Sequence, residues 1–368
     1  MARRTLGELG TAALRKGMRS VRYSAAPIWR SIARDCPPSP PNLELDVTDR
    51  CNMACRHCFA SPQYGPELSL DEIAVLANDI NPVTSLSLGG GEPFLREDLP
   101  EICALFSRRN PGLSIAVTTN GFNAEKICTT ARAVLERSPQ AGLWVILSLD
   151  GFRDTHDEIR QTAGAFDRSI ATARGLGELT HESSRLGFGF NATMTNLNWR
   201  ELPSLSKHLR TEFGVGLGCN LLSGTPRDSS LRLPATKDVR RTLSDMARLE
   251  SDSSAAYLKV FNSYRLAALK SGRQVVPCVA GSFYGTVTAN GDVRACALLP
   301  PLGNLRDAPF QSIWNGPLAA QQRESIRHGE CACHTDCYLR TSMAYYWKVP
   351  LSVYQARIAG LIERTERN

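Results

Sequence analysis

The feature that most constrains the fold is a regular alternation of short extended runs with helical runs, which begins at residue 42. Repeated strand-helix units of this kind form a parallel sheet covered by helices. We expect strands over Leu43–Thr48, Thr84–Leu88, Leu113–Val117, Leu143–Leu147, Leu186–Thr195 and Val215–Leu221. Helices are expected over Ser69–Asn78, Glu97–Ser107, Asn123–Arg137, Phe166–Leu179 and Trp199–Arg210. Six strands joined by right-handed crossovers predict an α/β fold, a partial (β/α)6 TIM-like barrel.

The expected strands carry polar residues on one face, which is unusual for a parallel sheet. In the first strand Glu44 and Asp46 alternate with leucines and valine, and in the fifth Asn191 and Thr193 alternate with apolar residues. Because the apolar face must contact the helices, we expect the polar face to line the inside of the barrel. Such a lining favours a polar, hydroxylated or peptidic ligand, and Glu44, Asp46 and Asp49 are candidates for a general base by position alone.

Three closely spaced cysteines follow the first expected strand. Cys51, Cys55 and Cys58 form a C-x3-C-x2-C motif in the loop. With 12 cysteines and no export signal, the chain is expected to work in a reducing, cytoplasmic compartment, where grouped cysteines bind metal. Three thiolates leave one position of a four-ligand site open for chemistry. The alternative is a zinc site completed by His57 or a distant residue.

The segment Thr48–Cys58, read TDRCNMACRHC, resembles the signature of the radical S-adenosylmethionine (radical SAM) superfamily. This resemblance implies that Cys51, Cys55 and Cys58 hold a [4Fe-4S] cluster whose fourth iron binds S-adenosylmethionine. It also implies that one electron from the cluster cleaves this cofactor and that the resulting 5′-deoxyadenosyl radical abstracts a hydrogen atom from the substrate.

The same resemblance continues through most of residues 42–340. Gly90, Gly91 and Glu92 match the family's GGE-P loop, which implies a contact with the methionine ammonium group, and glycine permits the close approach. Ser148 and Arg160 match the residues that bind the methionine carboxylate. Asn191 or Thr193 is expected near the ribose. Each short motif taken alone is typical of a turn, and it is their order after consecutive strands that carries the resemblance.

A second cysteine group lies near the C-terminus and comprises Cys278, Cys296, Cys331, Cys333 and Cys337. The first two flank residues 282–292, which we expect to form a hairpin that turns at Asn290-Gly291. The pattern resembles the auxiliary-cluster extension called SPASM, or its shortened form, twitch, but has five cysteines where the full pattern has seven. The resemblance therefore implies one auxiliary [4Fe-4S] cluster, with one of Cys331, Cys333 and Cys337 to spare. A zinc ribbon is the alternative.

The N-terminal residues 1–41 form a basic amphipathic arm that ends in a proline-rich spacer. They hold nearly all of the net charge of +7. Because this charge is confined to the arm, we expect no nucleic-acid partner. Residues 1–36 suit either a helix packed on the body or a peripheral contact with an anionic membrane. We expect further boundaries at 42–235 for the core, 236–276 for a connecting helix, 277–345 for the auxiliary domain and 346–368 for a terminal helix.

These features predict a radical SAM enzyme that oxidises or couples a polar small molecule, sugar or lipid-linked substrate. A peptide-modifying maturase is the alternative within the same class. A non-catalytic iron-sulfur scaffold is the alternative outside it, although a scaffold would not need Glu92, Ser148 and Arg160. The resemblance also implies a reductant partner of the flavodoxin or ferredoxin type. The substrate and the hydrogen abstracted do not follow from the sequence.

Overall fold

The structure is a computed structural model that describes residues 39–59, 66–250, 252–331 and 333–365. The predicted basic arm, residues 1–36, lies outside the described residues, as do Pro37 and Pro38 of its proline-rich spacer.

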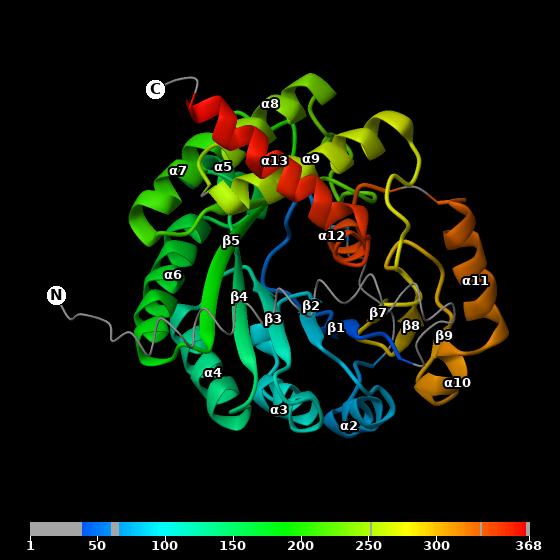
Figure 1. The fold of residues 1–368 in the computed structure, drawn as a ribbon. Helices are drawn as coiled ribbons and strands as arrows, with labels where there is room; N and C mark the ends of the chain where they lie inside the picture. Colours follow the sequence, from blue (N-terminus) through cyan, green and yellow to red (C-terminus); the bar gives the residue numbers. More distant parts are fainter. Residues whose placement is uncertain (1–38, 60–65, 251, 332, 366–368) are drawn as a thin grey trace, which may run out of the picture.

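Six parallel strands form the centre of the structure, as predicted. They are β1 (Asn42–Thr48), β2 (Ser85–Gly90), β3 (Ser114–Thr119), β4 (Gly142–Ser148), β5 (Leu186–Met194) and β6 (Leu217–Leu221). Each strand pairs in parallel with the next one along the chain. Figure 1 shows the strands curving around an interior with helices on the outside, which confirms the α/β partial barrel.

The outer layer contains the five predicted helices. They are α2 (Leu70–Asp79), α3 (Leu99–Arg109), α4 (Ala124–Arg137), α6 (Ala165–Glu182) and α7 (Leu202–Phe213). Helix α2 begins with a capping box formed by Ser69 and Glu72, in which each side chain accepts a hydrogen bond from the other residue's backbone N–H. The predicted helix bounds differ from the observed ones by a few residues, as expected for helix ends.

The predicted alternation of strand side chains is confirmed. In β1, Leu43, Leu45 and Val47 are buried in the core shared with the helices, whereas Glu44 and Asp46 are only partly buried on the opposite face. The same pattern runs along β5, where every second residue is buried. The inner face of the sheet, defined as the face opposite the helices, is therefore polar and keeps some exposure.

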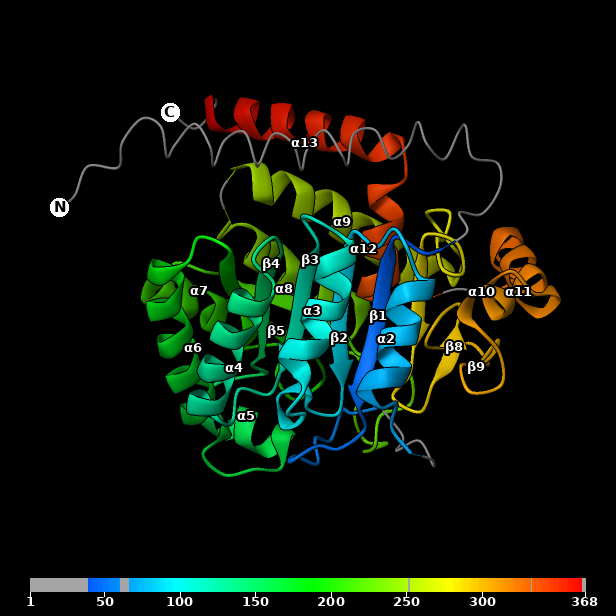
Figure 2. The ribbon, with the colours of Figure 1, turned by 90° about the horizontal axis from the view of Figure 1, so that it is seen from below.

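One helix beside the site was not expected from the sequence. Helix α5 (Arg153–Arg160) follows β4 and has only three buried side chains, His156, Ile159 and Arg160. Two of these are polar, so the helix has no apolar stripe from which it could have been predicted. It lies at the carboxyl end of the strands, the end opposite α13 (Figure 2).

The C-terminal region extends the central sheet. The predicted hairpin is present as β7 (Tyr284–Val287) and β8 (Asp292–Arg294), which are antiparallel, and β9 (Gly303–Asn304) follows. Strand β7 also pairs in parallel with β1, so the sheet has nine strands in the order β6-β5-β4-β3-β2-β1-β7-β8-β9. The sequence did not predict this pairing.

Helices complete the C-terminal half. They are α8 (Thr236–Ala247), α9 (Asp252–Ser271), α10 (Phe310–Trp314), α11 (Pro317–His328), α12 (Asp336–Ala344) and α13 (Lys348–Thr365). Figure 2 shows α9 and α13 beyond the amino ends of the strands. The region predicted as one connecting helix thus contains two, α8 and α9. A buried ion pair between Arg265 of α9 and Asp336 of α12, 3.1 Å apart, connects this layer to the auxiliary region.

None of the described helices is both long enough and apolar enough to cross a membrane.

Candidate functional site

The loop after β1 lies directly against the loop after β2. Gly91 N–H donates to the carbonyl of Thr48 at 2.7 Å, and Glu92 N–H donates to the carbonyl of Arg50 at 2.8 Å. A Cβ atom on Gly90 would lie 2.1 Å from the Thr48 oxygen, and one on Gly91 would lie 2.1 Å from the Arg50 oxygen. The two glycines are therefore required for this close backbone approach.

The carboxylate of Glu92 is buried at the same junction, with the residue 4% exposed. It accepts hydrogen bonds from the backbone N–H of Phe94, from the hydroxyl of Thr119 at 2.8 Å and from the backbone N–H of Asn120 at 2.7 Å. Burial raises the pKa of Glu92 although these donors oppose the shift. The carboxylate of Glu92 thus joins the loop after β2 to the end of β3 and the loop that follows it. Its Oε2 atom has one donor, Asn120, and can accept a second hydrogen bond.

A buried charge network stands behind the cysteine loop. Asp150 is fully buried, and its Oδ2 atom lies 2.7 Å from Nη2 of Arg160 and 3.0 Å from Nε2 of His57. Its Oδ1 atom accepts a hydrogen bond from the backbone N–H of Thr193 at 2.8 Å. Burial is the largest influence on the pKa of Asp150 and would raise it, but Arg160 and His57 together hold that pKa far below its usual range.

Arg160 contacts the cysteine loop directly. Its Nη1 atom donates to the sulfur of Cys55 at 3.6 Å, while Nη2 is paired with Asp150. Its Nε atom is buried and has no hydrogen-bond partner among the described residues. A buried guanidinium N–H without an acceptor fits the methionine carboxylate that the sequence resemblance implies for this residue.

His156 is buried behind the same network. Its Nδ1 atom accepts a hydrogen bond from the backbone N–H of Asp150 at 3.0 Å. Burial first, and then the nearby positive charge of Arg160, lower the pKa of His156 to about 4. The ring is therefore neutral at physiological pH.

The three cysteines of the first group lie in one loop, after β1. Cys51 is exposed, Cys55 is buried and Cys58 is partly buried. Each of Cys55 and Cys58 acts electrostatically on Cys51, and Cys58 acts on Cys55. In the ranges that the structure describes, no three Cys, His, Asp or Glu side chains converge tightly enough to hold a single metal ion. Ligands of a four-iron cluster need not converge in this way, because each thiolate binds a different iron.

A second segment secures the cysteine loop and was missed by the sequence analysis. Arg227 N–H donates to the carbonyl of Cys58, and Asp228 N–H donates to the carbonyl of Arg56, both at 2.9 Å. The Asp228 carboxylate also pairs with the guanidinium of Arg56 at 2.7 Å. These contacts join residues about 170 positions apart in the chain, and no local sequence pattern signals them.

The remaining predicted cofactor residues lie on neighbouring strands. Ser148 of β4 is directly opposite Asn191 of β5, which in turn is opposite Gly218 of β6. A Cβ on Gly218 would come 2.7 Å from Oδ1 of Asn191, so the glycine makes room for the amide. All three belong to the inner face, and Ser148 is the last residue of β4, at the carboxyl end of the strands where ligands of such barrels bind.

Deeper in the barrel, the inner face carries two partly buried carboxyl groups. Glu44 accepts a hydrogen bond from the hydroxyl of Tyr284 on β7 at 3.0 Å. Burial raises the pKa of Glu44, and burial followed by the negative charge of Glu44 raises the pKa of Asp46 to about 8. Asp46 therefore titrates near neutral pH.

A tryptophan lies on the same face and was not predicted from the sequence. Trp144 of β4 is 47% exposed although it belongs to a central strand. A Cβ on Gly187 of β5 would lie 2.2 Å from the indole ring, and one on Gly189 would lie 3.2 Å from it. The ring thus covers a stretch of β5 where only glycine leaves room, and part of the indole stays exposed.

The second cysteine group separates into four residues and one. Cys278 has Cys331 and Cys333 as electrostatic neighbours, and Cys296 has Cys333 and Cys278. For Cys337, at the start of α12, burial and then the negative charges of Glu44 and Asp336 raise the pKa of the thiol to about 12. The fifth thiol, that of Cys337, is thus influenced by Glu44 of β1 and by its own helix rather than chiefly by the other cysteines.

Three further cysteines pack in or against the core. Cys103 and Cys219 are buried, Cys128 is partly buried, and all three belong to or contact the main hydrophobic cluster. Burial raises the pKa of Cys219 to about 12. The Cys219 side chain is therefore a protonated thiol at neutral pH.

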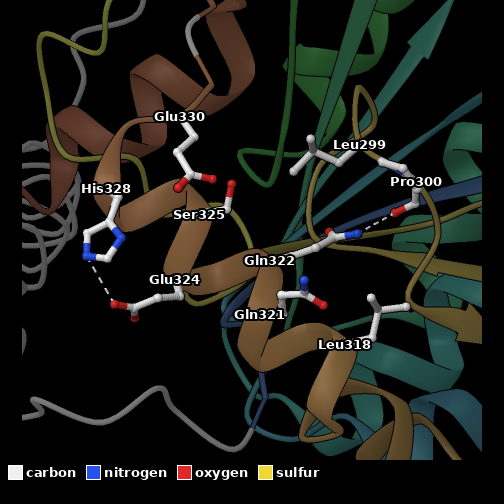
Figure 3. A pocket seen from close by; sticks show the side chains of 9 residues that line it. All are labelled: Leu299, Pro300, Leu318, Gln321, Gln322, Glu324, Ser325, His328 and Glu330. Atoms are coloured by element: carbon white, nitrogen blue, oxygen red, sulfur yellow. Dashed lines mark hydrogen bonds and ion pairs between the residues drawn. The ribbon is translucent and has the colours of Figure 1, made fainter.

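A surface hollow of about 470 Å³ lies apart from these groups. It is formed by one side of α11 together with Leu299 and Pro300, and the side chain of Gln322 donates to the Pro300 carbonyl at 3.0 Å (Figure 3). None of the predicted cofactor or cysteine residues lines it.

Comparisons with known proteins agree with this geometry. The profile of the radical SAM superfamily matches residues 45–209, and that of an iron-sulfur cluster-binding domain called SPASM matches residues 278–338. The chain is 30% identical to pre-heme d1 synthase of Dinoroseobacter shibae over 83% of this chain and 82% of that protein. It is 26% identical to mycofactocin maturase MftC of Mycolicibacterium smegmatis over 79% and 74% of the two chains.

Among solved structures, SuiB of Streptococcus suis bound to its precursor peptide SuiA has a similar fold. The TM-score is 0.57 at 15% identity, covering 84% of this chain and 71% of that one. At this level of identity, the likeness supports the partial barrel and its extension alone.

Proposed function

The chain belongs to the radical SAM superfamily and carries a C-terminal SPASM iron-sulfur domain, and from this premise we propose that it oxidises a small molecule bound on the inner face of the barrel. It is an enzyme that uses a [4Fe-4S] cluster, S-adenosylmethionine and an auxiliary cluster. When bound, the first cluster and S-adenosylmethionine would supply a 5′-deoxyadenosyl radical, which takes a hydrogen atom from the substrate. The auxiliary cluster would accept the electron that is then left on the substrate.

For the cofactor, we propose the residue roles implied by the motifs. Cys51, Cys55 and Cys58 hold the reducing cluster. Backbone groups of Gly90 and Gly91 lie close to the cysteine loop and suit the methionine ammonium group, while the unpaired Nε of Arg160 suits the carboxylate. Ser148, at the carboxyl end of β4, lies beside Asn191 of β5, and both suit the rest of the cofactor.

The observation that carries the substrate proposal is the composition of the inner face. It combines an exposed indole, Trp144, with the carboxyl groups of Glu44 and Asp46. An aromatic surface binds a flat ring, and carboxyl groups bind polar substituents. We therefore propose a substrate that presents a ring with polar groups, and Asp46, whose pKa is raised to about 8, as the residue that exchanges a proton with it.

For the auxiliary cluster, we propose that Cys278, Cys296, Cys331 and Cys333 are the ligands and that Cys337 is not. Cys331 and Cys333 act electrostatically on Cys278, and Cys278 and Cys333 act on Cys296, whereas the charges that act most on Cys337 are those of Glu44 and Asp336. Four thiolates complete a [4Fe-4S] cluster and leave no iron open to substrate. Such a cluster accepts or relays an electron, which favours net two-electron oxidation.

Iron analysis tests this ligand set. The anaerobically reconstituted protein should contain about eight irons per chain, and Cys333→Ala should contain about four. Cys337→Ala is the matched control, since it removes a thiol from the same segment and should keep about eight. A fall to about four irons in Cys337→Ala would contradict the assignment.

A peptide substrate is the second candidate, and the similarity to mycofactocin maturase supports it. A reductant of the flavodoxin or ferredoxin type is a proposed partner in either case. A contact of residues 1–36 with anionic membranes also stays a proposal. Partitioning of the full chain and of a variant lacking residues 1–36 onto anionic vesicles tests it.

The proposed function is tested by incubating the reconstituted protein with a strong reductant and S-adenosylmethionine. Formation of 5′-deoxyadenosine is expected, and Cys55→Ala should abolish it. Substrate candidates with and without a ring are then compared by the rate at which they increase 5′-deoxyadenosine formation. Trp144→Ala should reduce the increase caused by ring-bearing candidates, while Trp347→Ala, which removes an exposed indole next to α13, should not. No 5′-deoxyadenosine from the intact protein would favour the non-catalytic scaffold.

A further inference from the structure

The buried Asp150–Arg160 pair lies against the sulfur of a cluster-binding cysteine. Asp150 and Arg160 are 2.7 Å apart, and the same guanidinium donates to the Cys55 sulfur at 3.6 Å. Arg160 is 7% exposed and Asp150 is fully buried, so water screens neither charge effectively. In a medium of low dielectric constant, charges held in fixed positions have a large effect on the energy of an electron added nearby.

The position of Asp150 is determined from several sides at once. Its carboxylate accepts from Thr193 on β5 and lies 3.0 Å from His57, and its backbone carbonyl accepts from Asn198 at 2.7 Å. His57 belongs to the cysteine loop itself, between Cys55 and Cys58. One carboxylate therefore anchors both the loop and Arg160 to the ends of β4 and β5.

We propose that Asp150 is a positioning residue for the reducing cluster, and that Asp150 and Arg160 set its reduction potential in opposite directions. This inference rests on the proposed ligand set Cys51, Cys55 and Cys58. In the step concerned, one electron passes to the oxidised cluster from a reductant, titanium(III) citrate in the test, and titanium(III) becomes titanium(IV). No bond forms or breaks. The hydrogen bond to sulfur and the positive charge of Arg160 stabilise the reduced cluster, while the negative charge of Asp150 destabilises it.

The test is a potentiometric titration of the reconstituted full-length protein. It follows the electron paramagnetic resonance signal that changes when S-adenosylmethionine is added, which identifies the cluster at Cys51, Cys55 and Cys58. Asp150→Asn should move the midpoint potential to more positive values, and Arg160→Gln should move it to more negative values. The double variant, in which both charges are removed, should lie closer to the wild type than either single variant.

Two kinds of control separate this effect from loss of structure. Asp154→Asn removes the same charge from an exposed position on α5 and should leave the potential unchanged. Arg160→Lys and Asp150→Glu keep the charges and should retain both the iron content and a potential near that of the wild type. These variants keep the test decisive if a charge-removing variant does not fold.

The inference is overturned if Asp150→Asn and Arg160→Gln shift the potential in the same direction, or if neither shifts it more than Asp154→Asn. It is also overturned if the charge-conserving variants shift as far as the charge-removing ones. Absence of any cofactor-sensitive signal in the wild type is a different result, because it would overturn the proposed function on which the inference rests.

Discussion

Single residues carry most of the chemistry, and the sequence indicated some of them better than others. Gly90, Gly91 and Arg160 were predicted because each belongs to a short motif, and the structure gives each a physical reason for its identity. The ion pair of Asp150 with Arg160 was not predicted, although Asp150 lies only two residues after Ser148. A motif shows which residues are present. The contact between Asp150 and Arg160, ten positions apart, also depends on helix α5, which ends at Arg160 and was not predicted.

At the residue scale, the raised pKa of Asp46 predicts a pH-dependent stability. The pKa is about 8 in the folded protein against a reference of 3.8, because burial and Glu44 disfavour the charged form. Between these values the folded state binds more protons than the unfolded state, so its stability falls as pH rises. Asp46→Asn removes the titrating group and with it this decrease in stability. Between pH 6 and pH 8, the free energy of unfolding of the variant, measured in urea, should therefore rise by about 1 to 2 kcal/mol relative to that of the wild type.

The matched control for this prediction is Asp71→Asn in the exposed first turn of α2. It should leave the pH dependence as it is in the wild type. Equal pH profiles of Asp46→Asn and the wild type would show that Asp46 is ionised in the folded protein at neutral pH.

At the scale of elements, the strands were predicted well because their apolar and polar residues alternate with a period of two. Strand β7 was predicted as part of a hairpin, but its pairing with β1 was not, since the two strands are more than 200 residues apart. Helix α5 was missed for a different reason, the lack of an apolar stripe. Periodicity therefore predicts elements that bury an apolar face, whereas the sequence offers no comparable signal for long-range neighbours.

The junction between the loops after β1 and β2 should depend on the absence of a side chain at residue 90. Gly90 has φ of +115°, and a Cβ would overlap the Thr48 carbonyl oxygen. Gly90→Ala should therefore lower the free energy of unfolding for two reasons, the positive φ and the overlap with the carbonyl oxygen. The overlap should add about 3 kcal/mol to the loss that the positive φ alone would cause. Denaturant unfolding measures the difference.

Gly112→Ala is the control that measures the cost of positive φ without any steric overlap. Gly112 also has positive φ, +80°, but nothing lies within 4 Å of the position of its Cβ. This variant should cost only about 1 kcal/mol. Equal losses in the two variants would mean that the close approach of the loops is not needed for stability.

At the scale of the whole molecule, a buried ion pair connects the C-terminal helices. Arg265 of α9 is 2% exposed, pairs with Asp336 of α12 and donates to the Cys219 carbonyl of β6 at 2.7 Å. Arg265→Met should leave Asp336 buried without its partner and cost about 3 kcal/mol or more in unfolding free energy. Adding Asp336→Leu should recover much of this loss. A double variant as unstable as the single one would show that the arginine acts through its other contacts, with the Cys219 carbonyl and the Asn262 side chain.

The pairing of β7 with β1 gives the two iron-sulfur regions a common scaffold. The carboxyl end of β1 leads into the loop of Cys51, Cys55 and Cys58, while β7 follows Cys278 and precedes Cys296. A ladder of main-chain hydrogen bonds, rather than a hinge, thus determines how far apart the two centres lie. Electron tunnelling between them should proceed over one constant distance, at a rate that is independent of solvent viscosity.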